Sequence, residues 1–118
     1  MGSILTSIKK LLGIAEECED FDTDVMIFIN TVFPILSQLG VGPDEGFYIV
    51  DSTPAWSDYI TSGNTKLIGF VRTFTYLKVR LLFDPPVNST LLQSIEKTIE
   101  ELEERIIYEV ENVEVLIK

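Results

Sequence analysis

The fold of this chain is decided by residues 67–113, which read LIGFVRTFTYLKVRLLFDPPVNSTLLQSIEKTIEELEERIIYEVENV. On both sides of the break at Phe83-Asp84-Pro85-Pro86, apolar residues recur at steps of three and four, which is the spacing of one helical face. The predicted stripe of the first helix consists of Leu67, Ile68, Val71, Phe74, Leu77, Leu81 and Leu82, and that of the second consists of Leu92, Ile95, Ile99, Leu102 and Ile106. Both prolines lack an amide donor, and Pro85 disfavours helical geometry at Asp84, so a helix must end there. The stretch therefore predicts two long helices that pack as an antiparallel hairpin.

The two predicted helices carry opposite charge. The first contains Lys66, Arg72, Lys78 and Arg80, and no acidic residue occurs between Tyr59 and Phe83. The second has Lys97 and Arg105 against a run of glutamates at positions 96, 100, 101, 103, 104, 109 and 111. This segregation indicates a surface for assembly and not a catalytic site.

We expect the assembly contact to use residues of both helices. The candidates are the cations Arg72, Lys78 and Arg80 together with the acids Glu100, Glu101 and Glu104. Because surface ion pairs contribute only about 0–1 kcal/mol each, such a contact also needs buried apolar area. Trp56 and Tyr59, which lie beside turn signals, are interpreted either as anchors of that contact or as ordinary core residues.

The first half of the chain predicts shorter helices. Residues 3–12 form an amphipathic pattern that ends at Gly13, a position suited to a left-handed cap. A second pattern runs from Asp22, a candidate N-cap, to Gly40, and we expect Pro34 to kink it near Asn30. Thr53 and Pro54 favour the start of a short helix that stops at Gly63.

The remaining segments have weaker signals. Residues 41–51 predict a loop that contains at most one short strand, at residues 47–50. Either Asn88 or Ser89 caps the last helix. The weak alternation in residues 112–118 leaves a tail, a short strand or an arm to a neighbouring subunit as alternatives.

Size and composition predict one all-α domain over residues 1–118. A chain of 118 residues with 46% hydrophobic residues suffices for one core and lies far from the composition of disordered chains. The expected architecture is a small orthogonal or antiparallel bundle of four to five helices with a long C-terminal helix, with at most a short strand or hairpin added.

Several classes of function are disfavoured by what the sequence lacks. It has no histidine, no phosphate-binding glycine pattern and a single cysteine, Cys18, without an activating base. Asp20, Asp22 and Asp24 alternate but lack the glycine and glutamate of an EF-hand, so helix capping is the better interpretation. We therefore expect no enzyme activity, no cofactor and no metal site.

The charge and the hydropathy pattern also limit the partners. A formal net charge of −10 argues against a grip on nucleic acid, because such a grip depends on lysine and arginine neutralising phosphates. No uninterrupted apolar run has the length of a membrane span. DNA is expected only as a neighbour, and the membrane is not expected as a partner.

Four segments resemble a known family. They are residues 7–14 (SIKKLLGI), 29–30 (IN), 38–42 (QLGVG) and 76–86 (YLKVRLLFDPP). Together they are similar to the small head-tail connector, or adaptor, proteins of tailed phages and prophages of Gram-positive bacteria. The resemblance extends to about Glu111, and its most specific part is the basic helix that ends in Phe-Asp-Pro-Pro.

The resemblance implies a mainly helical, non-enzymatic structural protein of the virion, assembled in the host cytoplasm. It further implies a ring of about a dozen copies beneath the portal that extends the DNA channel and docks the next connector, a head-completion or stopper protein, or a tail protein. An acidic channel wall suits that role, since like charge keeps duplex DNA from adhering. Two other interpretations remain: a small acidic regulator or DNA mimic that binds a basic partner, and a carboxylate-metal enzyme built on the glutamate-rich face.

Overall fold

The computed structural model describes the backbone of residues 2–117 and the side chains of residues 2–111. Along the chain the helices are α1 (Ile4–Leu11), α2 (Asp22–Gln38), α3 (Trp56–Tyr59), α4 (Thr65–Phe83) and α5 (Ser89–Ile117). Residues 2–117 contain no β-strand, and the one isolated bridge among them pairs Ser3 with Ala55. The predicted all-α fold is confirmed, and the strand left open at residues 47–50 is not formed.

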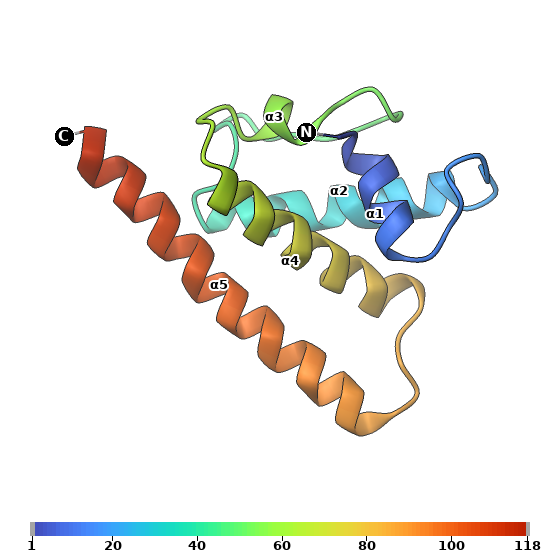
Figure 1. Cartoon of the computed structure of the whole chain (residues 1–118). Helices are drawn as coiled ribbons and strands as arrows, with labels where there is room; N and C mark the ends of the chain where they lie inside the picture. The colour runs from blue at the N-terminus through green and yellow to red at the C-terminus, as the bar shows by residue number, and fades with distance from the viewer. Residues whose placement is uncertain (1, 118) are drawn as a thin grey trace.

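Helices α4 and α5 form the predicted hairpin, with α5 running back along α4 (Figure 1). Asn64 starts α4 by accepting a hydrogen bond from the amide of Leu67 at 3.1 Å. The helix ends at Phe83, directly before the Asp-Pro-Pro signal. Asn88, the first of the two candidate caps, accepts the amides of Thr90 and Leu91 at 2.8 and 3.0 Å and so begins α5.

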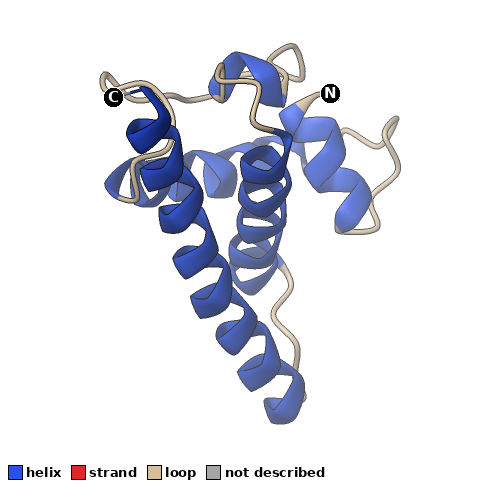
Figure 2. Ribbon diagram, turned by 60° about the vertical axis from the view of Figure 1, so that its left-hand side comes forward, coloured by secondary structure: helices blue, strands red, loops and turns tan. Residues whose placement is uncertain are grey.

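Helix α5 buries the predicted stripe except for Leu92, which is partly buried, and projects beyond its partner. Its core-facing side chains are Ile95, Ile99, Leu102 and Ile106. Figure 2 shows the first turns of α5 extending past the end of α4. The helix continues to Ile117, so the backbone of residues 112–117 is neither a coil tail nor a strand.

Helix α4 has a broader buried surface than the sequence predicted, because it packs against α1, α2 and α5 together. Thr75 and Val79 are fully buried although neither belongs to the predicted stripe, and Thr75 donates its hydroxyl to the carbonyl of Val71 at 2.8 Å. Leu82, which the prediction placed in the stripe, is 51% exposed. A single apolar stripe assumes that α4 packs against one partner, so it does not predict the second buried side of this helix.

The start of α2 differs from the prediction. Asp22 was expected to cap the helix, but Phe21 occupies the cap position and makes no side-chain cap bond. The Asp22 carboxylate instead lies 2.7 Å from the Nζ atom of Lys9, whose side chain is 3% exposed. Lys9 also donates to the carbonyls of Glu16 and Cys18 at 3.0 and 2.6 Å. One buried cation thus fastens the loop between α1 and α2.

The loop between α2 and α3 is shaped by glycines and by one asparagine. Gly40, Gly42 and Gly46 have positive φ angles of 92°, 84° and 92°, a region that favours glycine. Asn30 on α2 holds the far side of the loop: its side-chain amide donates to the carbonyl of Ile49 and accepts from the amide of Ile49, at 2.9 and 2.8 Å. Helix α3 begins at Trp56, two residues later than predicted, because the amide of Ala55 is already held by the Asp58 carboxylate at 2.8 Å.

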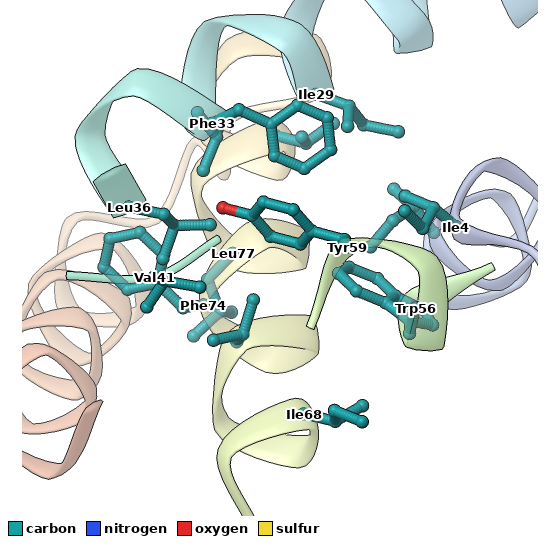
Figure 3. Packing of buried hydrophobic residues seen from close by; sticks show 14 of the residues in the cluster. Ile4, Ile29, Phe33, Leu36, Val41, Trp56, Tyr59, Ile68, Phe74 and Leu77 are labelled. Carbon is teal, nitrogen blue, oxygen red and sulfur yellow. The ribbon is translucent and has the colours of Figure 1, made fainter. Parts of the chain in front are cut away.

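The core lies where these elements meet. Figure 3 shows Ile4 of α1, Ile29 and Phe33 of α2, and Ile68 and Phe74 of α4 converging on the side chains of the α3 region. Gly13 and Gly40 adopt the left-handed conformation that their predicted positions at helix ends require, whereas α3 ends at Tyr59, four residues before its predicted end at Gly63. Across the described residues, no helix combines the length and the apolar character needed to cross a membrane.

Candidate assembly interface

Trp56 and Tyr59 lie inside the protomer. Trp56 is fully buried, and its Nε1 atom donates to the hydroxyl of Ser7 at 2.8 Å. The Tyr59 ring is 2% exposed and packs between Phe33 and Phe47, with ring centroids 4.7 and 4.9 Å away. The core interpretation therefore describes both residues, and neither is exposed as an anchor on the surface of the protomer.

The hydroxyl of Tyr59 is an unusual feature of this core. It is buried and has no hydrogen-bond partner among the described residues. Burial without a partner disfavours the phenolate and raises the pKa of Tyr59 above its ordinary value. Figure 3 shows this hydroxyl directed toward Leu36, in surroundings that are otherwise apolar.

The predicted cations of α4 are half-buried and unpaired. Arg72, Lys78 and Arg80 are each partly covered, and the Lys78 ammonium lies 5.7 Å from the centre of the Phe74 ring. Among side chains that the structure describes, the one ion pair joins Lys9 to Asp22. The α4 cations thus have packed stems and charged groups that no acid of the described chain neutralises.

The acids of α5 are displayed on the outside of the hairpin. Glu100, Glu101 and Glu104 are exposed, as are Glu96 and Glu111. Helical spacing places Glu96, Glu100, Glu104 and Glu111 near one another on a side of α5 away from its buried stripe, whereas Glu101 neighbours Arg105 one turn on. The result is a rigid acidic ridge along an exposed helix.

Two of the predicted acids border a groove between α4 and α5. It has a volume of about 560 Å³, and its lining consists of Lys66, Phe70, Glu101, Glu104, Arg105, Tyr108 and Glu109. The rings of Phe70 and Tyr108 provide apolar surface, and Tyr108 is 64% exposed. A groove with an aromatic lining and a charged rim is suited to the side chains of another protein.

This arrangement agrees with a comparison of the whole sequence with protein families. The family model described as phage connector protein matches residues 4–113. The chain belongs to the phage connector protein family. Comparison with curated proteins found no match, and comparison with solved structures found none either.

The family assignment gives the connector a structural role in phage particles. Within the described residues, no three histidine, cysteine, aspartate or glutamate side chains are grouped to hold an ion. Of the alternating aspartates, Asp22 is paired with Lys9.

The structure adds residues of the connector that sequence reasoning missed. Phe70 was overlooked because it belongs to a helix rich in core residues, yet it is only half-buried. Tyr108 carried a usable signal, because an aromatic residue two positions after Ile106 lies off the apolar stripe of α5. The partnership of Lys66 with this groove depends on how α4 and α5 cross, which no pattern within either helix specifies.

Proposed function

We propose that this connector assembles head to tail as a ring beneath the phage portal after DNA packaging, where it extends the DNA channel and docks the next connector, a stopper or a tail protein. The role is non-enzymatic and belongs to the virion, with assembly in the host cytoplasm. The observation that carries the proposal is the set of unpaired charges of opposite sign on α4 and α5.

A ring needs two different surfaces on each subunit, because a heterologous contact joins one patch to another and closes by rotation. This protomer supplies two such patches: the cations Arg72, Lys78 and Arg80, and the acids Glu100, Glu101 and Glu104. In the proposed contact the cations of one copy face the acids of the next. The groove beside Phe70 and Tyr108 contributes the apolar area that ion pairs alone do not provide.

The channel wall follows from the same arrangement. Part of the glutamate face of α5 lines the lumen in this proposal and repels the phosphates of passing DNA. Cryo-microscopy of the ring assembled on the portal tests this point. Glutamates found on the outer rim would refute the proposed lining.

Charge reversal tests the subunit contact directly. One triple variant changes Arg72, Lys78 and Arg80 to Glu, and a second changes Glu100, Glu101 and Glu104 to Lys. Each alone presents two patches of like charge and should not assemble, whereas an equal mixture should form rings of alternating variants. Sedimentation velocity at low ionic strength provides the readout, with electron microscopy on purified portal rings where the free protein is monomeric.

A matched control reverses three acids elsewhere. Glu16, Glu17 and Glu19 are exposed in the loop between α1 and α2, and their change to Lys alters net charge by the same amount. This variant should assemble as the unmodified protein does. The proposed contact is excluded if the mixture does not assemble, or if the control variant fails to assemble as well. A stoichiometric complex with a basic DNA-binding protein would instead favour a DNA mimic.

A further inference from the structure

Residues 47–50 of the loop between α2 and α3 resemble a strand that lacks a neighbour. The side chains alternate: Ile49 is 2% exposed, whereas Tyr48 and Val50 are 72% and 71% exposed. Apart from Val87, these two are the most exposed large hydrophobic side chains that the structure describes. The chain passes from Gly46 to Ile49 without helix, turn or bend. An apolar pair is thus displayed at the end of this extended segment, where the chain bends at Val50.

One backbone edge of this segment is already occupied. The carboxamide of Asn30 bonds both the N–H and the C=O of Ile49, at 2.8 and 2.9 Å, as a peptide group of a neighbouring strand would. In an extended chain, successive residues direct their N–H and C=O groups to opposite edges. The C=O of Tyr48 and the N–H of Val50 share trans peptide groups with Ile49 and therefore face away from Asn30, and neither residue has a backbone hydrogen bond to any described residue. The second edge is open.

The open edge is held in place by the core. Phe47 packs on Phe33 and Tyr59, with ring centroids 5.5 and 4.9 Å away, and Ile49 is buried beneath the loop. The loop lies on the same side of the molecule as α3, away from the connection between α4 and α5 (Figure 1). Since the edge is already ordered, a strand that binds to it loses little conformational entropy on the side of the connector.

Charge around the edge selects the partner. Asp44, Glu45 and Asp51 flank it and are exposed, and the sequence has no lysine or arginine between Lys10 and Lys66. A second copy is a poor source of a basic strand, because the cations of residues 2–111 all lie in α1, α4 and α5. The chemistry fits an extended segment of another protein, with lysine or arginine alternating with apolar side chains.

We propose that residues 47–50 are a strand-addition site at which a basic, extended segment of another protein pairs with Tyr48 and Val50. Backbone hydrogen bonds of that segment satisfy the open edge, its apolar side chains cover Tyr48 and Val50, and its cations meet the flanking acids. The site uses none of the α4 cations or α5 glutamates of the proposed subunit contact. Peptide binding and ring assembly therefore succeed or fail independently.

The probe is an octapeptide of alternating lysine and valine with blocked ends, added to the full-length connector labelled with ¹⁵N. The matched control peptide is methylated on every backbone nitrogen, which keeps all charges and side chains but removes the hydrogen-bond donors. The amide signals of Tyr48 and Val50 should move and become protected from hydrogen exchange with the first peptide. Because each backbone bond to the edge is worth about tenfold in affinity, methylation should weaken binding by about tenfold or more.

Two protein variants complete the test. Val50→Pro removes one open-edge donor that bonds nothing in the protomer and should weaken binding by about tenfold. Tyr48→Ala, which leaves the backbone intact, should weaken binding by about threefold or more, whereas Tyr108→Ala, at an exposed tyrosine of α5, should leave it unchanged. The proposal is overturned if neither peptide binds, if both peptides bind equally, or if the amide changes are confined to α5. It is also overturned if the two tyrosine variants lose the same amount of binding.

Discussion

Replacing Lys9 by Met tests whether one buried cation organises the amino-terminal third of the connector. Met keeps the length and apolar stem of the side chain but removes the ammonium group. The change leaves the buried Asp22 oxygen without the only polar contact that the described residues give it, and it leaves the carbonyls of Glu16 and Cys18 without their donor. An uncompensated buried charge is among the most costly defects in a protein interior.

The magnitude follows from the burial of the two partners. Removing one member of a buried ion pair costs about 3–5 kcal/mol, and the 24% exposure of the Asp22 side chain places this pair at the lower end, at about 3 kcal/mol. A chain of 118 residues has an unfolding entropy of about 0.25 kcal/mol/K near its midpoint, so Tm should fall by about 12 °C. Domains of this size have total stabilities of about 6–18 kcal/mol, so the variant should still fold.

Thermal and urea unfolding followed by circular dichroism measure this loss. Lys10→Met is the matched control, because Lys10 is exposed and carries the same charge, and it should change the free energy of unfolding by about 0.5 kcal/mol or less. Combining Lys9→Met with Asp22→Leu should recover part of the loss, since the unpaired carboxylate is then absent. If the Lys9 variant proves as stable as the Lys10 variant, the buried pair does not hold the loop.

Three further substitutions probe the core and the loop above it. Tyr59→Phe removes a hydroxyl that has no partner and should raise the free energy of unfolding by about 1 kcal/mol in urea titrations at pH 7. Because burial in the folded state raises the pKa of Tyr59, this tyrosine ionises only in the unfolded chain as pH passes about 10. Above that pH, the free energy of unfolding of the unmodified protein should fall by up to about 1.4 kcal/mol per pH unit more than that of Tyr59→Phe. Parallel plots of unfolding free energy against pH for the two proteins would contradict this. Gly42→Ala places a methyl group against the Tyr59 ring, whereas Gly46 has a similar φ angle but open space around it. The free energy of unfolding should therefore fall by about 2 kcal/mol more in Gly42→Ala than in Gly46→Ala. Equal Tm values for the two variants would refute the contact. Asn30→Ala should lower the free energy of unfolding by about 2 kcal/mol and speed hydrogen exchange at the amide of Ile49. An unchanged exchange rate would show that the two hydrogen bonds between Asn30 and Ile49 are not formed in solution.

The long helices were predictable because their signals are local. The prolines and the Asn88 cap specify where α4 ends and α5 begins, and the buried residues of α5 follow the predicted spacing, whereas the end of α5 at Ile117 was not predicted. The burial of Val79 and the exposure of Leu82 were not predictable in this way. Both depend on a second helix packing against α4, and periodicity within α4 carries no information about that neighbour.

In the candidate sites too, local features could be predicted from the sequence and tertiary contacts could not. Exposed glutamates on α5 could be predicted, because charged residues off an apolar stripe face water by default. The role of Lys9 could not, since Glu16 and Cys18 lie in the loop after α1 and Asp22 begins α2. The contact of Asn30 with Ile49 could not be predicted either, because the two residues are nineteen positions apart in the sequence. Such pairings are tertiary facts with no periodic signature.

The connector uses its charges in two physically different ways. Lys9 is buried, paired with Asp22 and hydrogen-bonded to two carbonyls, so the cost of dehydrating it falls within folding. The cations of α4 are only half-buried: their stems are already packed, as Lys78 is over Phe74, but their charges stay hydrated and unpaired. Fixing the stems in advance lowers the entropy that association would cost, and leaving the charges in water makes association sensitive to salt. Added salt should therefore separate subunits of the proposed ring well before it destabilises the protomer.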